Sequence, residues 1–128
     1  MNTLRAKFEN FARLLASGKP LEAIERYYGD EVLVLENRKL ARAGKEACLA
    51  HERELLSQQP EPVSFKVLKS ALDEKSGHAF LEYVLRFVGP DGRAMRLDQV
   101  AVQRWSAGHI VEERFYYEGV VDEGEERE

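Results

Sequence analysis

The stretch VAVQRWSAGHIVEERFYYE (residues 100–118) decides the fold that the sequence predicts. Its two halves are rich in β-branched and aromatic residues, and the small residues Ser106-Ala107-Gly108 between them are typical of a hairpin turn. Similar runs precede it, joined by the glycine-containing loops DEKSG (73–77) and GPDG (89–92): VSFKVLKSAL (63–72), HAFLEYVLRFV (78–88) and AMRLDQVAVQRW (94–105). Together these runs predict a meander of four long antiparallel strands.

Three helices are predicted before that meander, over residues 4–16, 20–28 and 45–59. Pro20 starts the second helix and Gly29 ends it, because proline is favoured in a first helical turn and glycine after a last one. Pro60 prevents the third helix from continuing. Apolar residues recur at helical spacing in the first helix, at Leu4, Phe8, Phe11 and Leu15.

The run EVLVLE (31–36), between the second and third helices, is too short for a helix and predicts a further strand. Helices followed by a strand meander predict an α+β fold. We expect three N-terminal helices packed on a strongly bent, mostly antiparallel sheet, which would form a cone-shaped roll with one open mouth.

Composition limits the classes of function. The chain has 128 residues, 44% hydrophobic and 33% charged, which fits one globular domain, placed at residues 1–121. Its net charge of −4 argues against a partner with a phosphate backbone, so no nucleic acid is expected. Residues 122–128 (DEGEERE) are acidic and lack aromatic side chains, which predicts a disordered tail.

The cysteine, histidine and charged residues limit where the protein is expected to be located and which cofactors it is expected to bind. Charged residues interrupt the apolar residues of the start MNTLRAKFENFARLL (1–15). We therefore expect neither a signal peptide nor a membrane span there. The single cysteine, Cys48, excludes an internal disulfide and fits a reducing cytoplasm. The three histidines lack metal-ligand spacing, and HERE (51–54) lacks the second histidine of a zinc helix. We therefore expect a cytoplasmic protein with no membrane partner, no metal and no cofactor.

Three stretches carry a resemblance to a known superfamily: YYGDEVLVLEN (27–37), GKEACLAHERELL (44–56) and residues 100–118. Their order and spacing resemble those of the SnoaL-like group of the nuclear-transport-factor-2-like superfamily. The resemblance implies a pocket between the helices and the concave face of the sheet, and homodimers formed through the convex face. This scaffold carries isomerases, cyclases, epoxide hydrolases, dehydratases and non-catalytic modules, so the resemblance does not name a reaction.

Strand register decides which side chains face the pocket. A three-residue loop at 106–108 places Trp105 opposite His109 and therefore Ala101 opposite Glu113. In this register one face suits a ligand cavity, and the other, with Val100, Val102 and paired charges, suits a dimer interface. A one-residue slip would exchange the two faces and leave Glu113 as a surface acid.

The predicted ligand-binding residues come from the helices, the end of the first strand and the last hairpin. They are Phe11, Tyr28, Asn37, Gln99, Ala101, Gln103, Phe115 and Tyr117.

Glu36 is the first candidate for catalysis. In ketosteroid isomerases of this superfamily the general base is an acid at the end of the corresponding strand, and the resemblance places Glu36 there. A partly desolvated acid there would have a raised pKa and could transfer protons at neutral pH. The alternative is a structural ion pair with Arg38 or Arg42. The oxyanion donors of those isomerases fall on Phe11 and near Ala101, so steroid isomerisation is not expected.

His51 and Glu113 are the other catalytic candidates. His51, on the third helix, could form an acid–base pair with Glu36, or it could be a core histidine with a single hydrogen bond. Glu113 lies in an apolar row, where a carboxylate must be paired, protonated or used. If it shares the pocket with Glu36, one of the two acids is expected to stay protonated.

Two classes of function follow from these residues. The first is a pocket protein for a small apolar or cyclic molecule, with cofactor-free proton transfer by Glu36, His51 and Glu113. The second is a non-catalytic ligand-binding or dimerisation module. A third alternative is a purely structural dimer whose cone is filled by side chains. In each case the expected partner is a second copy of the chain, and the sequence does not decide whether the protein is an enzyme.

Overall fold

A computed structural model describes residues 3–126. Its elements in chain order are α1 (Leu4–Ala16), α2 (Pro20–Tyr27), β1 (Tyr28–Glu36), β2 (Lys39–Ala43), α3 (Lys45–Ser57), β3 (Ser64–Asp73), β4 (His78–Val88), β5 (Ala94–Ser106), β6 (His109–Tyr116), β7 (Val120–Asp122) and α4 (Glu123–Glu126). The strands form one sheet in the order β2-β1-β6-β5-β4-β3, with β7 paired to β5. Only the β1–β6 pair among these strands is parallel.

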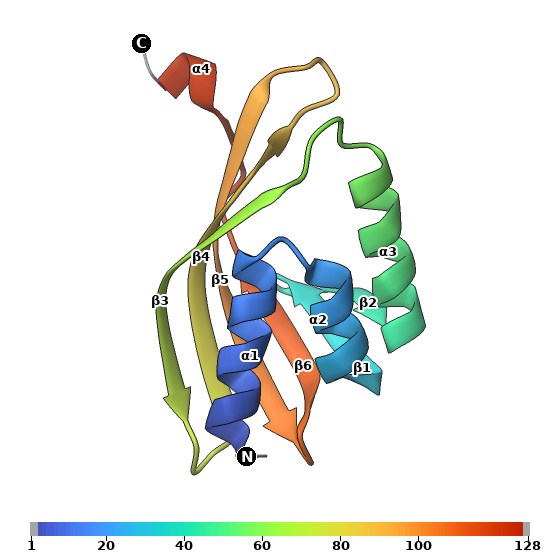
Figure 1. The fold of residues 1–128 in the computed structure, drawn as a ribbon, viewed down its shortest axis with the longest axis vertical. Coiled ribbons are helices and arrows are strands. Elements are labelled where there is room, and N and C mark those ends of the chain that lie inside the picture. Colours follow the sequence, from blue (N-terminus) through green and yellow to red (C-terminus); the bar gives the residue numbers. More distant parts are fainter. Residues whose placement is uncertain (1–2, 127–128) are drawn as a thin grey trace.

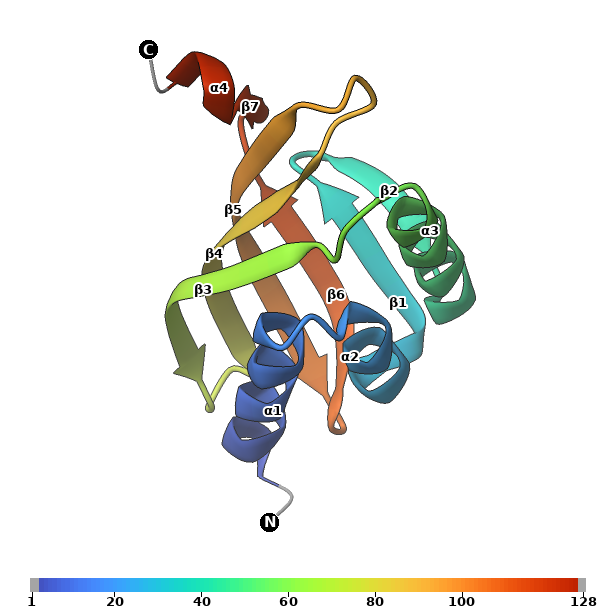
Figure 2. The ribbon, with the colours of Figure 1, turned by 45° about the horizontal axis from the view of Figure 1, so that its top comes forward.

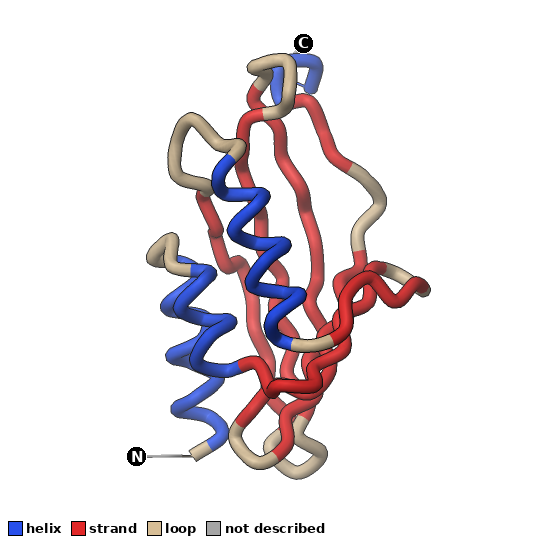
Figure 3. The backbone as a smooth tube through the Cα atoms, turned by 90° about the vertical axis from the view of Figure 1, so that its right-hand side faces the viewer, coloured by secondary structure: helices blue, strands red, loops and turns tan. Residues whose placement is uncertain are grey.

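The helices α1, α2 and α3 lie on one face of this sheet and leave the other face bare (Figures 1 and 3). Figure 2 shows that β3 bends sharply along its length. The predicted α+β class, with three helices packed on a bent and mostly antiparallel sheet, is confirmed. The third helix follows the β1–β2 hairpin and so is not contiguous with the other two.

Local sequence explains the first two helices. The Thr3 side chain caps α1 by accepting a hydrogen bond from the Ala6 amide at 3.1 Å, and Pro20 occupies the first turn of α2. The apolar stripe of α1 packs into the core, where the Phe11 ring meets Trp105 edge-on at 6.3 Å between centroids. Contacts of this kind fix the helices on the sheet.

The β1–β2 hairpin was not predicted. Asn37 and Arg38 form its turn, and Asn37 has a φ of 55°, a left-handed conformation that asparagine tolerates better than most residues. The strand that follows, KLARA, is largely exposed and lacks the alternation of apolar and polar residues that marks a strand. Its pairing brings Arg42 back towards Glu36.

The predicted register of the last hairpin was wrong. Two residues, Ala107 and Gly108, form the turn with φ values of 51° and 81°, which is the geometry of a tight hairpin. Beyond it, Trp105 pairs with Ile110, but Arg104 pairs with Glu112. Val111 is therefore an extra residue, a β-bulge that a sequence pattern does not reveal.

The bulge has two consequences for the buried face of the sheet. Gln103 lies opposite Glu113, and Ala101 lies opposite Phe115, in place of the predicted Ala101–Glu113 pair. Glu113 stays on the buried face, as predicted, whereas Ile110 takes the core position that Val111 was expected to fill.

The C-terminal residues also differ from the prediction. Residues 122–126, expected to belong to a disordered tail, form the end of β7 and the short helix α4. The acidic side chains of Asp122 and Glu123 are paired with arginines of the β4–β5 region, which the composition of the tail alone cannot show. Residues 127–128 of the predicted tail lie outside the described residues.

Candidate functional site

A cavity of about 320 Å³ lies between α3 and the sheet. This volume is at the lower end of the range for small-molecule sites. Its apolar wall comes from α3, the loop before β3 and strands β3 to β7: Leu55, Leu56, Val63, Phe65, Leu85, Phe87, Leu97, Phe115 and Val120. Its polar lining residues are Glu36, Arg42, His51, Glu52, Gln59, Tyr83, Gln99 and Tyr117.

Glu36 lies at the centre of a hydrogen-bonded cluster among the polar residues of the cavity lining. The hydroxyl of Tyr117 donates to Glu36 Oε1 at 2.5 Å, and Arg42 donates to Oε2 at 3.0 Å. Burial alone would raise the pKa of the Glu36 carboxyl, but these two hydrogen bonds outweigh it and hold the pKa below its ordinary value. The expectation of a raised pKa at Glu36 was therefore wrong, and the alternative that the sequence left open, an ion pair with Arg42, is present.

Two further titratable groups on α3 face the same cavity. Burial and the nearby Arg42 charge lower the pKa of His51, so the imidazole is mostly neutral at pH 7. Burial raises the pKa of Glu52, although Arg42 opposes this shift. The cavity thus holds one carboxyl group with a lowered pKa and another with a raised pKa.

A second polar cluster lies in the core. Glu113 is 2% exposed, and its carboxylate accepts a hydrogen bond from the Tyr28 hydroxyl and another from Gln103 Nε2 at 2.7 Å. Trp105 Nε1 donates to Gln103 Oε1 at 2.9 Å, which fixes the amide. Burial raises the pKa of Glu113, and the two hydrogen bonds reduce that shift without cancelling it.

The structure brings five of the predicted site residues to the cavity wall and leaves six elsewhere. Those on the wall are Glu36, His51, Gln99, Phe115 and Tyr117. The remaining six are Phe11, Tyr28, Asn37, Ala101, Gln103 and Glu113. Five of these are buried in the core and do not line the cavity, and Asn37 is in the β1–β2 turn, where its side chain accepts a hydrogen bond from the Tyr117 amide at 3.1 Å.

Sequence reasoning missed Glu52 and the apolar lining from α3 and β4, and it considered Arg42 only as an ion-pair partner of Glu36. The sequence placed Glu52 directly after His51 on the third predicted helix. Nothing in HERE (51–54), however, distinguishes an acid that lines a cavity from one that faces solvent. Arg42 could be placed only once β2 was known to pair with β1. Within residues 3–126 no group of acids, histidines and cysteine is arranged to hold a metal ion.

Solved structures share this fold. A protein assigned as a SnoaL-like polyketide cyclase from Mesorhizobium loti is 23% identical, with a TM-score of 0.67, and the match covers 90% of this chain and 99% of that chain. A second protein assigned to the same class, from Jannaschia sp. CCS1, is 15% identical, with a TM-score of 0.71 over 88% of this chain and 85% of its own.

The epoxide hydrolase/cyclase-like enzyme SalBIII, which has a role in pyran ring formation in the polyether salinomycin, gives a TM-score of 0.73. It is 12% identical, and the match covers 90% of each chain. No protein-family profile and no curated protein matches the sequence. The chain therefore has the SnoaL-like, nuclear-transport-factor-2-like fold, which confirms the predicted resemblance at the level of the fold.

None of the helices within the described part of the chain is both long and apolar enough to cross a membrane.

Proposed function

We propose that the protein binds a small apolar or cyclic molecule with one polar group in the cavity beneath α3. The observation that supports this function is the division of the cavity lining into an apolar wall and a polar cluster around Glu36. An apolar wall supplies affinity through burial of the ligand, and a few fixed polar groups orient it.

A neutral, polarity-sensitive naphthalene ketone such as Prodan tests this proposal. We expect saturable binding with a blue-shifted emission, which Leu97→Trp abolishes because the larger side chain fills the cavity. Leu40→Trp is the matched control, because Leu40 lies on β2 and is 59% exposed. Equal binding by the native protein and Leu97→Trp would overturn the proposed site.

A second candidate function is cofactor-free proton transfer, and the opposite pKa shifts of Glu36 and Glu52 favour it. Groups with separated pKa values in one cavity can act as base and acid. Glu36, with its lowered pKa, is ionised at neutral pH and supplies the base, while Glu52 is the group more disposed to hold a proton. Neutral His51 beside them could carry the proton between the two.

5-Nitrobenzisoxazole is a suitable probe, since removal of its C3 proton by a carboxylate breaks the N–O bond and releases a coloured cyanonitrophenolate. We expect saturable turnover that Glu36→Gln abolishes. Glu118→Gln, at an exposed position outside the cavity lining, should retain it. Unchanged turnover in Glu36→Gln would remove the catalytic role and leave the binding function.

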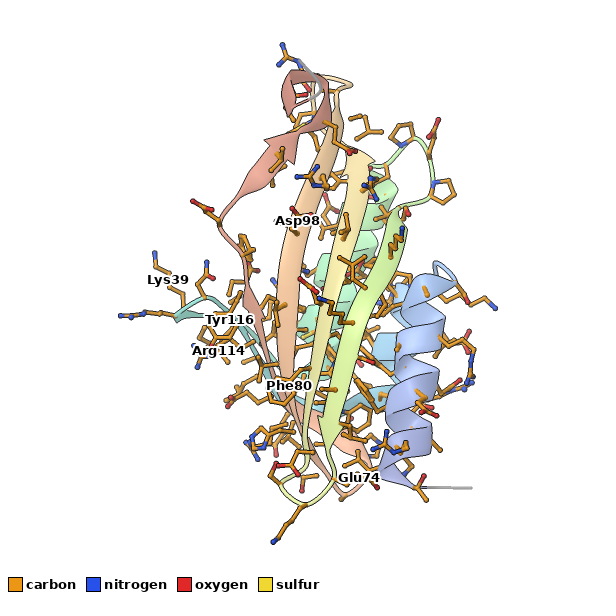
Figure 4. All side chains as sticks on the ribbon, turned by 90° about the vertical axis from the view of Figure 1, so that its left-hand side faces the viewer. Lys39, Glu74, Phe80, Asp98, Arg114 and Tyr116 are labelled. Atoms are coloured by element: carbon orange, nitrogen blue, oxygen red, sulfur yellow. The ribbon has the colours of Figure 1, made fainter. Side chains whose placement is uncertain are left out.

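We also propose that a second copy of the chain covers the bare face of the sheet. Phe80 and Tyr116, 38% and 48% exposed, lie on that face together with Arg114 and Asp98 (Figure 4). Apolar side chains among charges of both signs suit a self-complementary interface. Light scattering should give twice the 14.7 kDa mass of the chain, and Phe80→Glu should halve it. A native mass equal to one chain would contradict this proposal.

A further inference from the structure

The segment after Tyr117 runs back along the sheet and joins it. β7 pairs antiparallel with the first part of β5, with Val120 opposite Leu97 and Asp122 opposite Met95. Figure 2 shows β7 and α4 beside β5, at the end of the long β4–β5 hairpin. The C-terminal residues Val120–Glu123, here called the strap, therefore extend the sheet next to the cavity.

Ion pairs hold the strap at its far end. Arg93 donates to Asp122 at 3.0 Å, and Arg86 donates to Glu123 at 3.3 Å. Arg96 lies 3.9 Å from the same Glu123 carboxylate. The side chains of Asp122 and Glu123 are only 14% and 13% exposed, so these contacts are less screened by water than ordinary surface pairs.

The first residue of the strap belongs to the cavity. Val120 lines it, as does its cross-strand partner Leu97. Successive residues of a strand point to opposite faces, and Val121, the next residue, does not line the cavity. At the other end of the loop that leads into the strap, Tyr117 is bonded to Glu36. The strap thus continues directly from the polar cluster to the apolar wall.

We propose that the strap is a working part of the ligand site, in which Val120 contacts the bound molecule. The arginines of β4, β5 and the loop between them hold the strap in position. This inference rests on the proposed binding function. A ligand that extends along the apolar wall from Glu36 meets Val120, so the strap selects for the length and polarity of the apolar part. Release of the ion pairs would open the wall on this side.

Two aspartate variants separate contact with the ligand from a general effect of charge. Val120→Asp places a carboxylate in the cavity wall and should weaken Prodan binding about tenfold. Val121→Asp adds the same charge one residue further along, facing away from the cavity, and should change the dissociation constant less than about twofold. Thermal melting of both variants checks that they fold.

Hydrogen exchange tests docking of the strap without any ligand. Neighbouring amides of a strand point to opposite sides, so those amides of residues 120–122 that bond to β5 should be protected in the native protein. Glu123→Gln should make them exchange faster. Salt at about 1 M should do the same, because it shortens the range of the ion pairs. Glu118→Gln, at an exposed acid of the same segment, should leave the protection unchanged.

The outcomes distinguish the strap from the binding function. If the native protein binds Prodan but both aspartate variants bind it equally well, Val120 is not a ligand contact and the inference is wrong. Absence of protection at every one of the amides 120–122 in the native protein would also overturn it. If the strap amides are protected but no ligand binds the native protein, the proposed function itself fails, and the ligand-contacting role of Val120 fails with it.

Discussion

Two tyrosine–glutamate pairs in this protein have the same chemistry and opposite electrostatic behaviour. In the cavity, the Tyr117 hydroxyl donates to Glu36, and in the core the Tyr28 hydroxyl donates to Glu113. Each glutamate accepts one more side-chain hydrogen bond, from Arg42 in the first case and from Gln103 in the second. Yet the pKa of Glu36 lies below its ordinary value and that of Glu113 above it.

The difference arises from burial and from the charge of the second donor. The Glu36 side chain is 33% exposed and touches a guanidinium, which stabilises the charged form. Glu113 is 2% exposed, and its second donor is a neutral amide, so desolvation dominates. A hydrogen bond from tyrosine therefore does not by itself determine whether a carboxyl group is held ionised.

The comparison assigns the two acids different roles. Glu36 is open to the cavity and can meet a ligand, whereas Glu113 connects Tyr28, Gln103 and Trp105 within the core. A buried polar network that is fully hydrogen-bonded can specify one packing of the strands. This structural role explains why a carboxylate lies in an apolar row of β6.

The largest expected effect that tests the different roles of Glu36 and Glu113 is on the free energy of unfolding. Glu113→Ala leaves the buried Tyr28 hydroxyl and the Gln103 amide without an acceptor and opens a hole, so the free energy of unfolding should fall by about 3 kcal/mol. Glu36→Ala removes a partly exposed pair and should cost about 1 kcal/mol or less. Urea unfolding measures both. Equal losses would mean that Glu113 is not the structural acid.

Removal of the hydroxyl groups of Tyr28 and Tyr117 should give smaller losses of stability. Tyr28→Phe removes a donor from a fully buried carboxyl group and should destabilise the fold by about 2 kcal/mol. Tyr117→Phe acts at the cavity, where water can replace the hydroxyl, and should cost about 0.5 kcal/mol. Thermal melting of the two variants compares them directly, and a larger loss for Tyr117→Phe would reverse our assignment.

The smallest effect is on the pH dependence of stability. The raised pKa of Glu113 contributes stability that is complete below pH 4.5, its ordinary value, and is lost as the pH rises through the native pKa. The lowered pKa of Glu36 contributes stability above pH 4.5 that is lost as the pH falls through the native pKa.

Glu113→Gln and Glu36→Gln isolate these contributions when unfolding is measured across the pH range. The stability difference between native protein and Glu113→Gln should shrink as the pH rises above 4.5. The difference for Glu36→Gln should shrink only as the pH falls below that value. Two differences that change in the same direction would be inconsistent with opposite pKa shifts.

The elements that depend on local patterns could be predicted from the sequence. The spacing of Phe8 and Phe11 and the position of Pro20 gave helices whose ends agree with the structure to within about one residue. The third helix ends at Ser57, two residues before the predicted end. Long runs of strand-forming residues likewise marked β3 to β6. These signals are short-range, and the core contacts reinforce them.

The features that determine the site depend on distant residues and were missed for that reason. The bulge at Val111 moves the register of β6 without any glycine or proline to mark it. The lowered pKa of Glu36 needs Arg42 and Tyr117, which only the pairing of β1 with β2 and β6 brings near. The C-terminal acids look solvated in sequence because their arginine partners lie 27 or more residues earlier.

The measurement that most directly tests the contrast between the two acids is a carboxyl-carbon NMR titration of the native protein, with Glu36 and Glu113 assigned through their glutamine variants. We predict that Glu36 titrates below the ordinary glutamate value of 4.5 and Glu113 above it. A Glu113 that titrates at or below 4.5, or a Glu36 that titrates above it, would contradict the division between a cavity acid and a structural core acid.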